Sequence, residues 1–295
     1  MRLLITGATG FIGQSLVPVL LKEYSNWEIM LLSRNLEKAQ KYYPLVDTIK
    51  LIHVAATDFK AVEGFDPQVV IHLAAMNTSR DDTDVIHPLV ETNVEYGIRL
   101  LDSLSRCSNM RLFVYPGSFA EYRYGEGKVN SAYLYAATKT AFRVFLDYYS
   151  ERCHFNYITA VLYSVYGGNT TVKRLIDYMK DSLDSSEPIK MTGGEQILDF
   201  VHIDDVVRFF TYVVEHLDVL FCTVPNGECF HIGTGVGTMV KNVAAILEQK
   251  YGKKCNIDWG ALPYRERDVM YAVASIAKNL KFLKWKSQIS LQAGL

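Results

Sequence analysis

The chain has 295 residues, of which 49% are hydrophobic and 21% charged, a composition typical of a folded globular protein and unlike that of a disordered one. A formal net charge of −1 and a pI near 6.7 give no overall field that would favour nucleic acid or an anionic membrane. No uncharged apolar run approaches the ~20 residues of a membrane-spanning helix, so we expect neither nucleic acid nor membrane as a partner.

Short apolar runs alternate with helix-like stretches through the first half of the chain. The predicted strands are Leu3–Ile5, Glu28–Leu32, Thr48–His53, Val69–Leu73, Leu112–Tyr115 and Tyr157–Leu162. The predicted helices are Ile12–Tyr24, Leu36–Tyr43, Val90–Ser105 and Ala132–Glu151. Continuous apolar strands are typical of parallel sheets covered on both faces. The alternation therefore predicts an α/β fold, a Rossmann-type doubly wound parallel sheet with right-handed crossovers.

A glycine-rich turn, Thr6–Gly13, follows the first predicted strand with the spacing G-x-x-G-x-x-G. Gly7 permits a tight turn, Gly10 lets the backbone approach a pyrophosphate, and Gly13 lets helix and strand pack closely. The N-terminus of the helix that follows offers unpaired N–H groups and a partial positive charge to phosphates. A purely structural turn has the same spacing, but the position between the first strand and the first helix favours a dinucleotide site.

The end of the second predicted strand indicates which dinucleotide binds. NAD sites usually carry a carboxylate there for the adenosine ribose, but this strand ends in Ser33-Arg34-Asn35 without an acid. A hydroxyl and a guanidinium suit a 2′-phosphate, which a carboxylate would repel. We therefore predict NADP, with a solvated arginine as the alternative. Asp58, after the third strand, either reaches the adenine amine or caps a turn.

A phenol and an amine stand four residues apart, at Tyr135 and Lys139, which places them on one face of a predicted helix. Ser118 lies just beyond the fifth predicted strand, at the carboxyl edge where ligands of such sheets bind. A ketone that accepts hydride requires a proton donor, and a nearby ammonium would lower the phenol's pKa from its usual ~10. An aromatic surface helix would look similar, but the three residues in order after a glycine turn predict a catalytic set.

The alternation of strands and helices ends after residue 166. We predict an NADP-binding Rossmann domain over 1–166 and a smaller, interleaved substrate-binding lobe over 167–295, with parts near 200–217 and 228–250 returning to the first domain. The elements expected in the second half are a helix over Lys173–Ser182, strands at Ile189–Met191 and Asp199–Ile203, a helix to Leu217 capped by Asp204 or Asp205, a strand at Phe230–Ile232 and a helix through Gln249.

Other candidate signals are weaker. The five cysteines are scattered and contain no C-x-x-C pair, as expected of reduced thiols in a cytoplasmic protein. Cys229 and His231 share a strand face but lack two further ligands, so we predict no metal site. The second glycine cluster, Gly233–Gly237, is interpreted as a turn before a helix.

Together these motifs resemble the extended short-chain dehydrogenase/reductase family, in its nucleotide-sugar branch, nearly from end to end. The motifs that carry the resemblance are Thr6–Gly13, His72-Leu73-Ala74-Ala75, Asn93, Gly117-Ser118, Tyr135 with Lys139, Val165-Tyr166-Gly167, Asp199–Val206, Arg265 with Asp268, Lys278 and Trp285. Residues Thr192–Ile197 and the C-terminal stretch look most like the CDP-abequose synthase type, which are 4-ketoreductases of a deoxy-sugar nucleotide.

The resemblance implies roles for matched positions. At the cofactor it implies Gly7, Thr9, Gly10, Phe11, Ile12, Gly13, Arg34, Leu73, Ala74, Ala75, Asn93, Tyr135, Lys139 and Val165. At the substrate it implies Ser118, Phe119, Ser164 and Arg265, the last of which would approach the diphosphate. The apolar positions of 90–104 suit core packing, and such helices imply a homodimer in this family.

Departures from the family's motifs narrow the chemistry. Phe119-Ala120 stand where dehydratases carry an Asp-Glu pair, which disfavours elimination of water. No cysteine follows Ser118, which removes a base used for inversion at C3 or C5. Val161 and Leu198 replace arginines that are common in the family, and Ser164 replaces an asparagine, so the identity of the sugar and base stays open.

These observations lead to one main hypothesis and two alternatives. The main hypothesis is an NADPH-dependent reductase of a nucleotide-linked 4-keto-6-deoxy sugar, with Tyr135 as proton donor, Lys139 adjusting its pKa and Ser118 holding the carbonyl oxygen. The first alternative is a nucleotide-sugar 4-epimerase with bound NAD. The second is a non-catalytic NADP-binding scaffold or sensor, against which the intact catalytic set argues.

Overall fold

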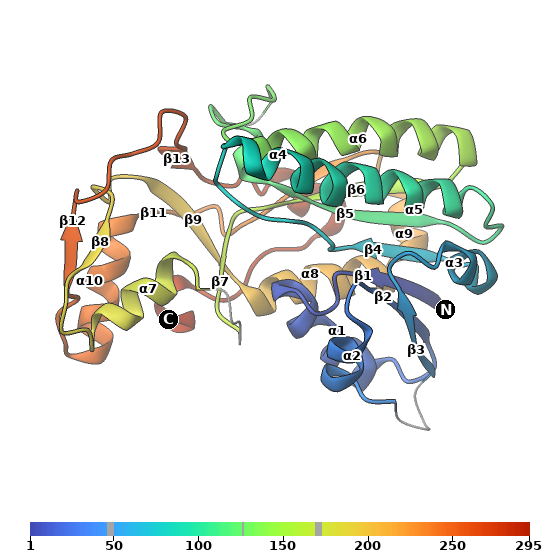
Figure 1. Cartoon of the computed structure of the whole chain (residues 1–295), viewed down its shortest axis with the longest axis horizontal. Helices are drawn as coiled ribbons and strands as arrows, with labels where there is room; N and C mark the ends of the chain where they lie inside the picture. The colour runs from blue at the N-terminus through green and yellow to red at the C-terminus, as the bar shows by residue number, and fades with distance from the viewer. Residues whose placement is uncertain (46–49, 126, 169–172) are drawn as a thin grey trace.

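The structure is a computed structural model that describes residues 1–45, 50–125, 127–168 and 173–295. Figure 1 shows a large body built on one sheet with helices on both faces, and a smaller lobe beside it that contains the C-terminus. In the described ranges, no helix combines the length and apolar character that crossing a membrane requires.

A seven-stranded sheet forms the large body, in the order β10-β6-β5-β4-β1-β2-β3, and every neighbouring pair is parallel. Its strands are β1 (Arg2–Thr6), β2 (Glu28–Ser33), β3 (Lys50–Ala55), β4 (Val69–His72), β5 (Leu112–Ser118), β6 (Asn156–Leu162) and β10 (Cys229–Ile232). The predicted Rossmann-type parallel sheet is confirmed. The first two residues of the strand predicted over Thr48–His53 lie outside the described residues.

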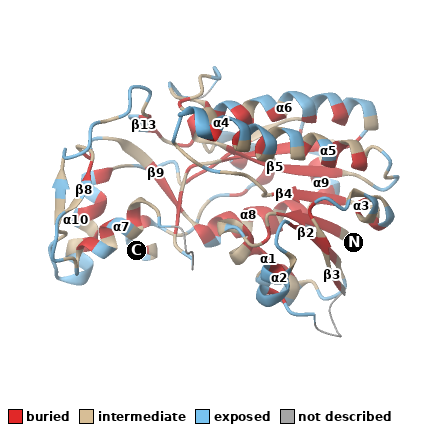
Figure 2. Cartoon of the chain, viewed as in Figure 1, coloured by how far each residue is buried: buried red, intermediate tan, exposed pale blue. Residues whose placement is uncertain are grey.

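Alternate residues of β1 supply two separate cores. Leu3 and Ile5 pack with α1 (Phe11–Glu23) and α8 (Ile203–Glu215) on one face. Leu4 packs on the other face with the helices α3 (Phe59–Phe65), α5 (Tyr96–Leu104) and α6 (Leu134–Cys153). Figure 2 shows the sheet buried between these layers. This burial on both faces accounts for the continuous apolar strands of the sequence.

The remaining helices of the large body lie at its periphery. They are α2 (Leu36–Tyr42), α4 (Thr83–Val90) and α9 (Leu217–Thr223). A π-helical turn, Glu91–Glu95, joins α4 to α5, so the helix predicted over Val90–Ser105 is present but begins earlier, at Thr83, and contains this turn. The turn contains Asn93, whose buried amide bonds both backbone groups of Met76 and the hydroxyl of Thr138. Such turns often accompany a side chain with a specific task.

The smaller lobe is built around β9 (Ile197–His202). This strand pairs with β7 (Ser164–Tyr166), β11 (Gly237–Met239) and β13 (Tyr271–Ala272). A second sheet and three helices complete the lobe, namely β8 (Ile189–Met191), β12 (Ile257–Trp259), α7 (Leu175–Ser182), α10 (Val240–Tyr251) and α11 (Leu291–Gly294).

Segments from the second half of the chain divide between the two bodies. The large sheet includes β10, and α8 packs against it, whereas α10 packs in the core of the smaller lobe. The residue that caps α8 is His202, whose Nδ1 accepts the N–H of Asp204 at 3.2 Å, so the predicted Asp204 or Asp205 cap is wrong. Asp205 instead accepts the backbone N–H groups of Gln288 and Ile289 and thereby anchors the C-terminal segment.

Candidate active site

The glycine turn lies against the end of β4. Gly7 has a φ of 69°, and a Cβ placed on it would lie 2.5 Å from the backbone nitrogen of Ala74. The hydroxyl of Thr6 accepts the Ala74 N–H at 3.1 Å and contacts the buried ring of His72 at 2.8 Å. The turn is therefore fixed beside Leu73 and Ala74, which are two of the predicted cofactor residues.

Helix α1 begins without a side-chain cap, since its N-cap residue is Gly10 and its first turn contains no acid. Gly13 is required for close packing, because its Cβ would come within 2.2 Å of the Ala8 carbonyl oxygen. Free N–H groups at a helix N-terminus, reached past side-chain-free glycines, match the needs of a pyrophosphate. These residues fit a dinucleotide.

Two buried hydroxyls near the end of β2 have no hydrogen-bond partner within the described part of the chain. They are Oγ of Ser33 and the phenol oxygen of Tyr96 on α5. Burial raises the pKa of Tyr96, while the nearby guanidinium of Arg34 opposes that rise. Hydroxyls in such a position fit a polar ligand entering from the carboxyl edge of the sheet. Asp58 caps α3 by accepting the N–H of Ala61, as one of its two predicted roles required.

Tyr135 and Lys139 lie one turn apart on α6, and burial shifts the pKa of each group. Burial raises the pKa of Tyr135, Glu121 adds to the rise and Arg174 opposes it. Lys139 is 3% exposed, its ammonium lies 4.1 Å from the centroid of the Tyr115 ring, and burial lowers its pKa to about 7. Arg174 is thus a cation whose charge opposes the rise in the pKa of Tyr135.

Ser118 ends β5 and begins a short helical turn, Phe119–Glu121. Its hydroxyl accepts the N–H of Ala120 at 3.2 Å, and its own N–H donates to the carboxylate of Glu121 at 2.8 Å. The ring of Phe119 stacks on Tyr163 with centroids 5.7 Å apart. The predicted catalytic serine therefore lies at the carboxyl edge of the sheet, beside an aromatic wall.

Two functional residues were missed in the sequence. Glu121 is fully buried and pairs with Arg143 of α6 at 2.8 Å. Its signal was the S-x-x-E pattern from Ser118, a capping box that is present in the structure. The second is Arg174, the N-cap residue of α7, whose guanidinium lies 3.8 Å above the ring of Phe11 and close enough to Tyr135 to affect its pKa.

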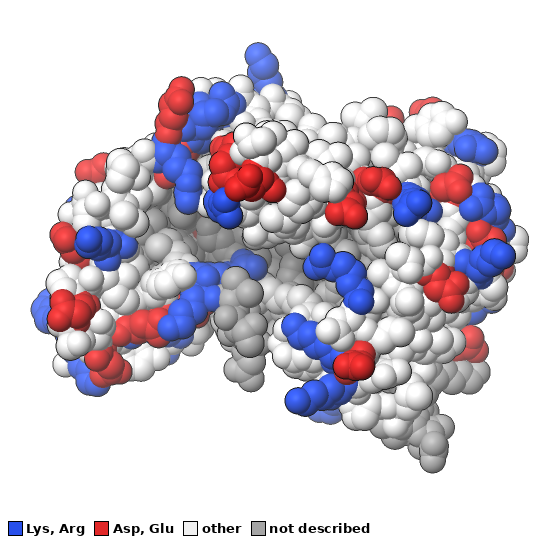
Figure 3. Space-filling view, viewed as in Figure 1, with Lys and Arg blue, Asp and Glu red and all other residues white. Residues whose placement is uncertain are grey.

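The two bodies meet near Tyr135, the predicted catalytic tyrosine. Arg174 belongs to the smaller lobe and donates to the carbonyl of Val165 in β7 (3.5 Å), yet its guanidinium also contacts Phe11 of the glycine turn in the large body. Arg265 lies 5.7 Å above the ring of Tyr133, two residues before Tyr135. Lys and Arg side chains border the hollow between the bodies in Figure 3. Ser164 pairs in register with Phe200 in the smaller lobe.

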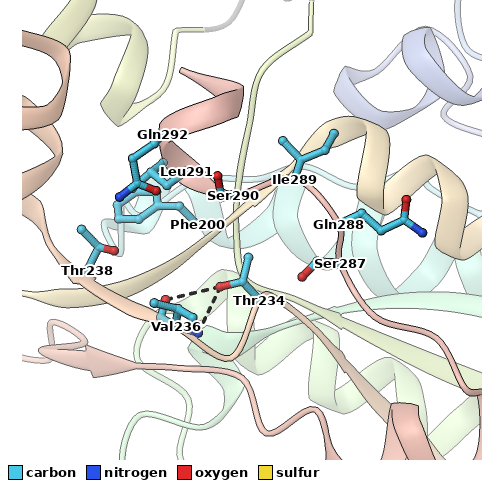
Figure 4. Close-up of a pocket in the computed structure, with 10 residues that line it drawn as sticks. All are labelled: Phe200, Thr234, Val236, Thr238, Ser287, Gln288, Ile289, Ser290, Leu291 and Gln292. Carbon is cyan, nitrogen blue, oxygen red and sulfur yellow. Dashed lines mark hydrogen bonds between the residues drawn. The ribbon is translucent and has the colours of Figure 1, made fainter. Parts of the chain in front are cut away.

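A separate cavity of about 310 Å³ lies between the smaller lobe and the C-terminal segment. It is lined by Phe200, Thr234 and Leu291, among others, and Figure 4 shows these side chains converging from β9, the loop before β11 and the chain end. None of the predicted catalytic or cofactor residues lines it. It is therefore distinct from the site around Tyr135.

Sequence comparison identifies relatives over the whole chain. The sequence model of the NAD dependent epimerase/dehydratase family matches residues 3–232. CDP-abequose synthase of Yersinia pseudotuberculosis is 28% identical over 273 residues, covering 92% of this chain and 91% of the relative. The CDP-abequose synthase of Salmonella typhimurium is 27% identical over 303 residues (99% and 95%). UDP-glucuronate 4-epimerase of Thermodesulfobacterium geofontis is 28% identical over 320 residues (99% and 93%).

Solved structures show the same fold. UDP-glucuronic acid 4-epimerase from Bacillus cereus, in complex with UDP-glucuronic acid and NAD, superposes with a TM-score of 0.86 at 23% identity, covering 100% of this chain and 96% of that one. MoeE5 in complex with UDP-glucuronic acid and NAD gives a TM-score of 0.84 at 22% identity, and the match again covers 100% of this chain and 96% of that one.

Proposed function

The chain belongs to the NAD dependent epimerase/dehydratase family, and on that premise we propose that it is an NADPH-dependent reductase of a nucleotide-linked 4-keto-6-deoxy sugar. The observation that carries the proposal is the position of Tyr135. Its phenol shares a helix face with Lys139 and lies within the field of Arg174, which itself stacks on Phe11 of the glycine turn. A proton donor therefore lies beside the dinucleotide turn.

The catalytic roles follow from the chemistry of each group. The nicotinamide cofactor, when bound, supplies the hydride that adds to C4. Tyr135 donates its proton to the carbonyl oxygen as that oxygen gains charge, and solvent later restores the proton. The hydroxyl of Ser118 donates a hydrogen bond that holds the same oxygen. Lys139, on the face of Tyr135, stabilises the phenolate that remains.

Cations at the hollow suit the diphosphate of a nucleotide sugar. Arg265 and Arg174 reach the neighbourhood of α6 from the smaller lobe and would replace the charge lost at Val161 and Leu198. The stacked rings of Phe119 and Tyr163 offer an apolar wall beside Ser118, which suits the methyl group of a 6-deoxy sugar. CDP-abequose synthases among the relatives support this substrate class.

NADP is preferred to NAD because of the groups at the end of β2. Ser33, Arg34 and Tyr96 provide a guanidinium and two hydroxyls without a hydrogen-bond partner among the described residues, and none of these groups repels a 2′-phosphate. The residues that would hold the remainder of the cofactor are those of the glycine turn with Leu73, Ala74 and Ala75, as predicted.

A C4 epimerase with tightly bound NAD is the second candidate. It is favoured by the 28% identity to the UDP-glucuronate 4-epimerase, and the fold is shared with NAD-bound epimerases. The same three catalytic residues would then oxidise and re-reduce C4. The nucleotide released on denaturing the purified protein separates the candidates, because stoichiometric NAD favours the epimerase and its absence favours the reductase.

Substituting Tyr135→Phe tests the proposal. NADPH consumption is measured with a cytidine-diphosphate-linked 4-keto-6-deoxyhexose. We expect kcat to fall by about 10²-fold or more, because the proton donor is lost, while NADPH affinity is retained. Tyr148→Phe on the exposed side of the same helix is the matched control and keeps activity. Full activity in Tyr135→Phe contradicts the proposal.

Exposed apolar side chains support a homodimer. They lie on the adjacent helices α4 and α6 and are Ile86, Val90, Val144, Phe145 and Tyr148. A monomer exposes scattered apolar residues, but a group on two neighbouring helices suits a helical interface. We propose that these helices pair with those of a second copy.

A further inference from the structure

A buried carboxylate lies directly behind Ser118. Glu121 is 0% exposed, and its Oε1 accepts the N–H of Ser118 at 2.8 Å. Its Oε2 accepts the hydroxyl of Thr140 at 2.8 Å and pairs with Nη2 of Arg143 at 2.8 Å. One side chain therefore joins the turn that carries the serine to two positions on α6.

The positions that Glu121 holds on α6 flank the catalytic face. Thr140 directly follows Lys139, and Arg143 lies one turn beyond Lys139. We propose that Glu121 is a positioning residue, which fixes the Ser118 turn against the Tyr135–Lys139 face of α6 and supplies the negative charge that acts on both groups. The inference rests on the catalytic roles proposed above for those three residues.

Stability alone gives no reason for this ion pair. Taking a carboxylate and a guanidinium out of water is expensive, and apolar residues of similar volume often stabilise a fold as well or better. Arg143 has further partners, since its Nη1 donates to the Tyr122 hydroxyl at 2.8 Å and contacts Sγ of Cys229 at 3.4 Å, although its buried Nε has no hydrogen-bond partner among the described residues. A buried charge with so many partners can hold two elements in one geometry.

The charge also acts on the reacting groups. Tyr135 faces Glu121, Arg174 and the buried Tyr115, and Lys139 faces Glu121, Arg143, His72 and the Tyr115 ring. Among the described residues, Glu121 is the carboxylate whose charge acts on both. It raises the pKa of Tyr135 and favours the charged form of Lys139. A protonated phenol beside an ammonium is the state that donates a proton.

Glu121→Gln is the direct test, because it keeps the shape and an acceptor oxygen but removes the charge. We expect kcat for NADPH-dependent reduction of the cytidine-diphosphate-linked 4-keto-6-deoxyhexose to fall about tenfold or more, with NADPH affinity kept within about twofold. The alkaline limb of the kcat–pH profile should move to lower pH, because loss of the negative charge lowers the pKa at which Tyr135 gives up its proton.

Two further variants separate charge from packing. Thr140→Val removes one hydrogen bond and keeps the carboxylate, so it should lower kcat without moving the alkaline limb. The double variant Glu121→Gln with Arg143→Gln leaves no unpaired buried charge and is the substitute if the single variant does not fold. It should show the same shift of the limb as Glu121→Gln.

Each outcome decides between distinct claims. A Glu121→Gln or double variant with wild-type kcat overturns the inference, and so does a loss of kcat with an unmoved alkaline limb. If Tyr135→Phe is inactive while Glu121→Gln behaves as wild type, only the role of Glu121 is wrong. If Tyr135→Phe retains activity, the proposed function itself fails.

Discussion

The Lys139 side chain is buried where its charge is costly. Its ammonium lies over the Tyr115 ring, and burial lowers its pKa to about 7, against ~10.4 for a lysine in an unfolded chain. Between these values the unfolded chain binds more protons than the folded one, so folding stability rises with pH. The loss of folding stability caused by burying Lys139 is fully present below pH 7, and it disappears as the pH rises towards the pKa of a lysine in the unfolded chain.

Lys139→Met should therefore stabilise the cofactor-free protein. We expect its midpoint of urea denaturation to exceed that of the wild type at pH 7, with the difference narrowing as the pH rises towards 10. Lys60→Met, at an exposed position, is the control and should show no such trend. A wild type more stable than Lys139→Met throughout the range would show that the burial penalty is absent.

Arg34 is the residue expected to distinguish the cofactors. Arg34→Gln should weaken NADP binding about tenfold or more, since a charge-assisted contact to the 2′-phosphate is lost, and leave NAD binding unchanged. Calorimetric titration of both dinucleotides measures this, with the exposed Arg152→Gln as control. Equal affinity of the wild-type protein for NAD and NADP would contradict the assignment.

The sequence patterns pointed to the catalytic candidates themselves, but not to the side chains that surround them in the fold. Tyr135, Lys139 and Ser118 have short-range signals, a four-residue spacing and a position after a strand. Arg174 carried no local signal, because its contact with Phe11 joins residues that lie far apart in the chain. The charge around Tyr135 depends on such distant contacts, which a local sequence pattern does not reveal.

Close packing at the start of α1 predicts that a larger residue at Gly13 would displace the whole helix. A Cβ on Gly13 would meet the backbone of Ala8 at 2.2 Å, so the helix would have to move away from the glycine turn. We expect Gly13→Ala to lower the free energy of unfolding by about 1–3 kcal/mol and to abolish dinucleotide binding.

Gly64→Ala is the matched control on α3. Beyond its own helix and chain neighbours, no atom of the described residues lies within 4 Å of the added Cβ, so this variant should be neutral or more stable by up to about 1 kcal/mol. Chemical denaturation and a dinucleotide titration measure both variants. Retained binding in Gly13→Ala would mean that the turn does not hold the cofactor.

Elements with a strong local pattern were the ones that could be predicted. The strands of the large sheet are continuous apolar runs, and their parallel direction followed from alternation with helices, whereas their order came only from the structure. The three-residue strand β7 and the two-residue strand β13 exist through pairing with β9, which no local pattern indicates. The π-helical turn at Asn93 likewise depends on bonds to Met76 and Thr138.

The proposed reaction would take place between the two bodies of the molecule. The large sheet provides the glycine turn, Ser118 and α6, and the smaller lobe brings Arg174 to the same place. The division of the chain near residue 166 stays a prediction. The later segments α8 and β10 pack with the large sheet, as the predicted interleaving of the two parts requires.

Association of two copies is tested at Val144, which is 68% exposed on α6. Val144→Asp should convert a dimer into a monomer in sedimentation-velocity measurements, because a carboxylate would be buried against apolar side chains. Val219→Asp, at an exposed position on α9, should leave the oligomeric state unchanged. A wild-type protein that sediments as a monomer would contradict the proposed helical interface.

Transfer of deuterium from cofactor to sugar tests the central claim most directly. The protein is incubated with NADPH deuterated at the transferred position and a cytidine-diphosphate-linked 4-keto-6-deoxyhexose, and the product is analysed by mass spectrometry and NMR. The proposed reaction predicts one deuterium at C4, one NADP⁺ formed for each sugar reduced, and loss of both in Tyr135→Phe. A product without deuterium, or a sugar inverted at C4 with no net oxidation of NADPH, would contradict it.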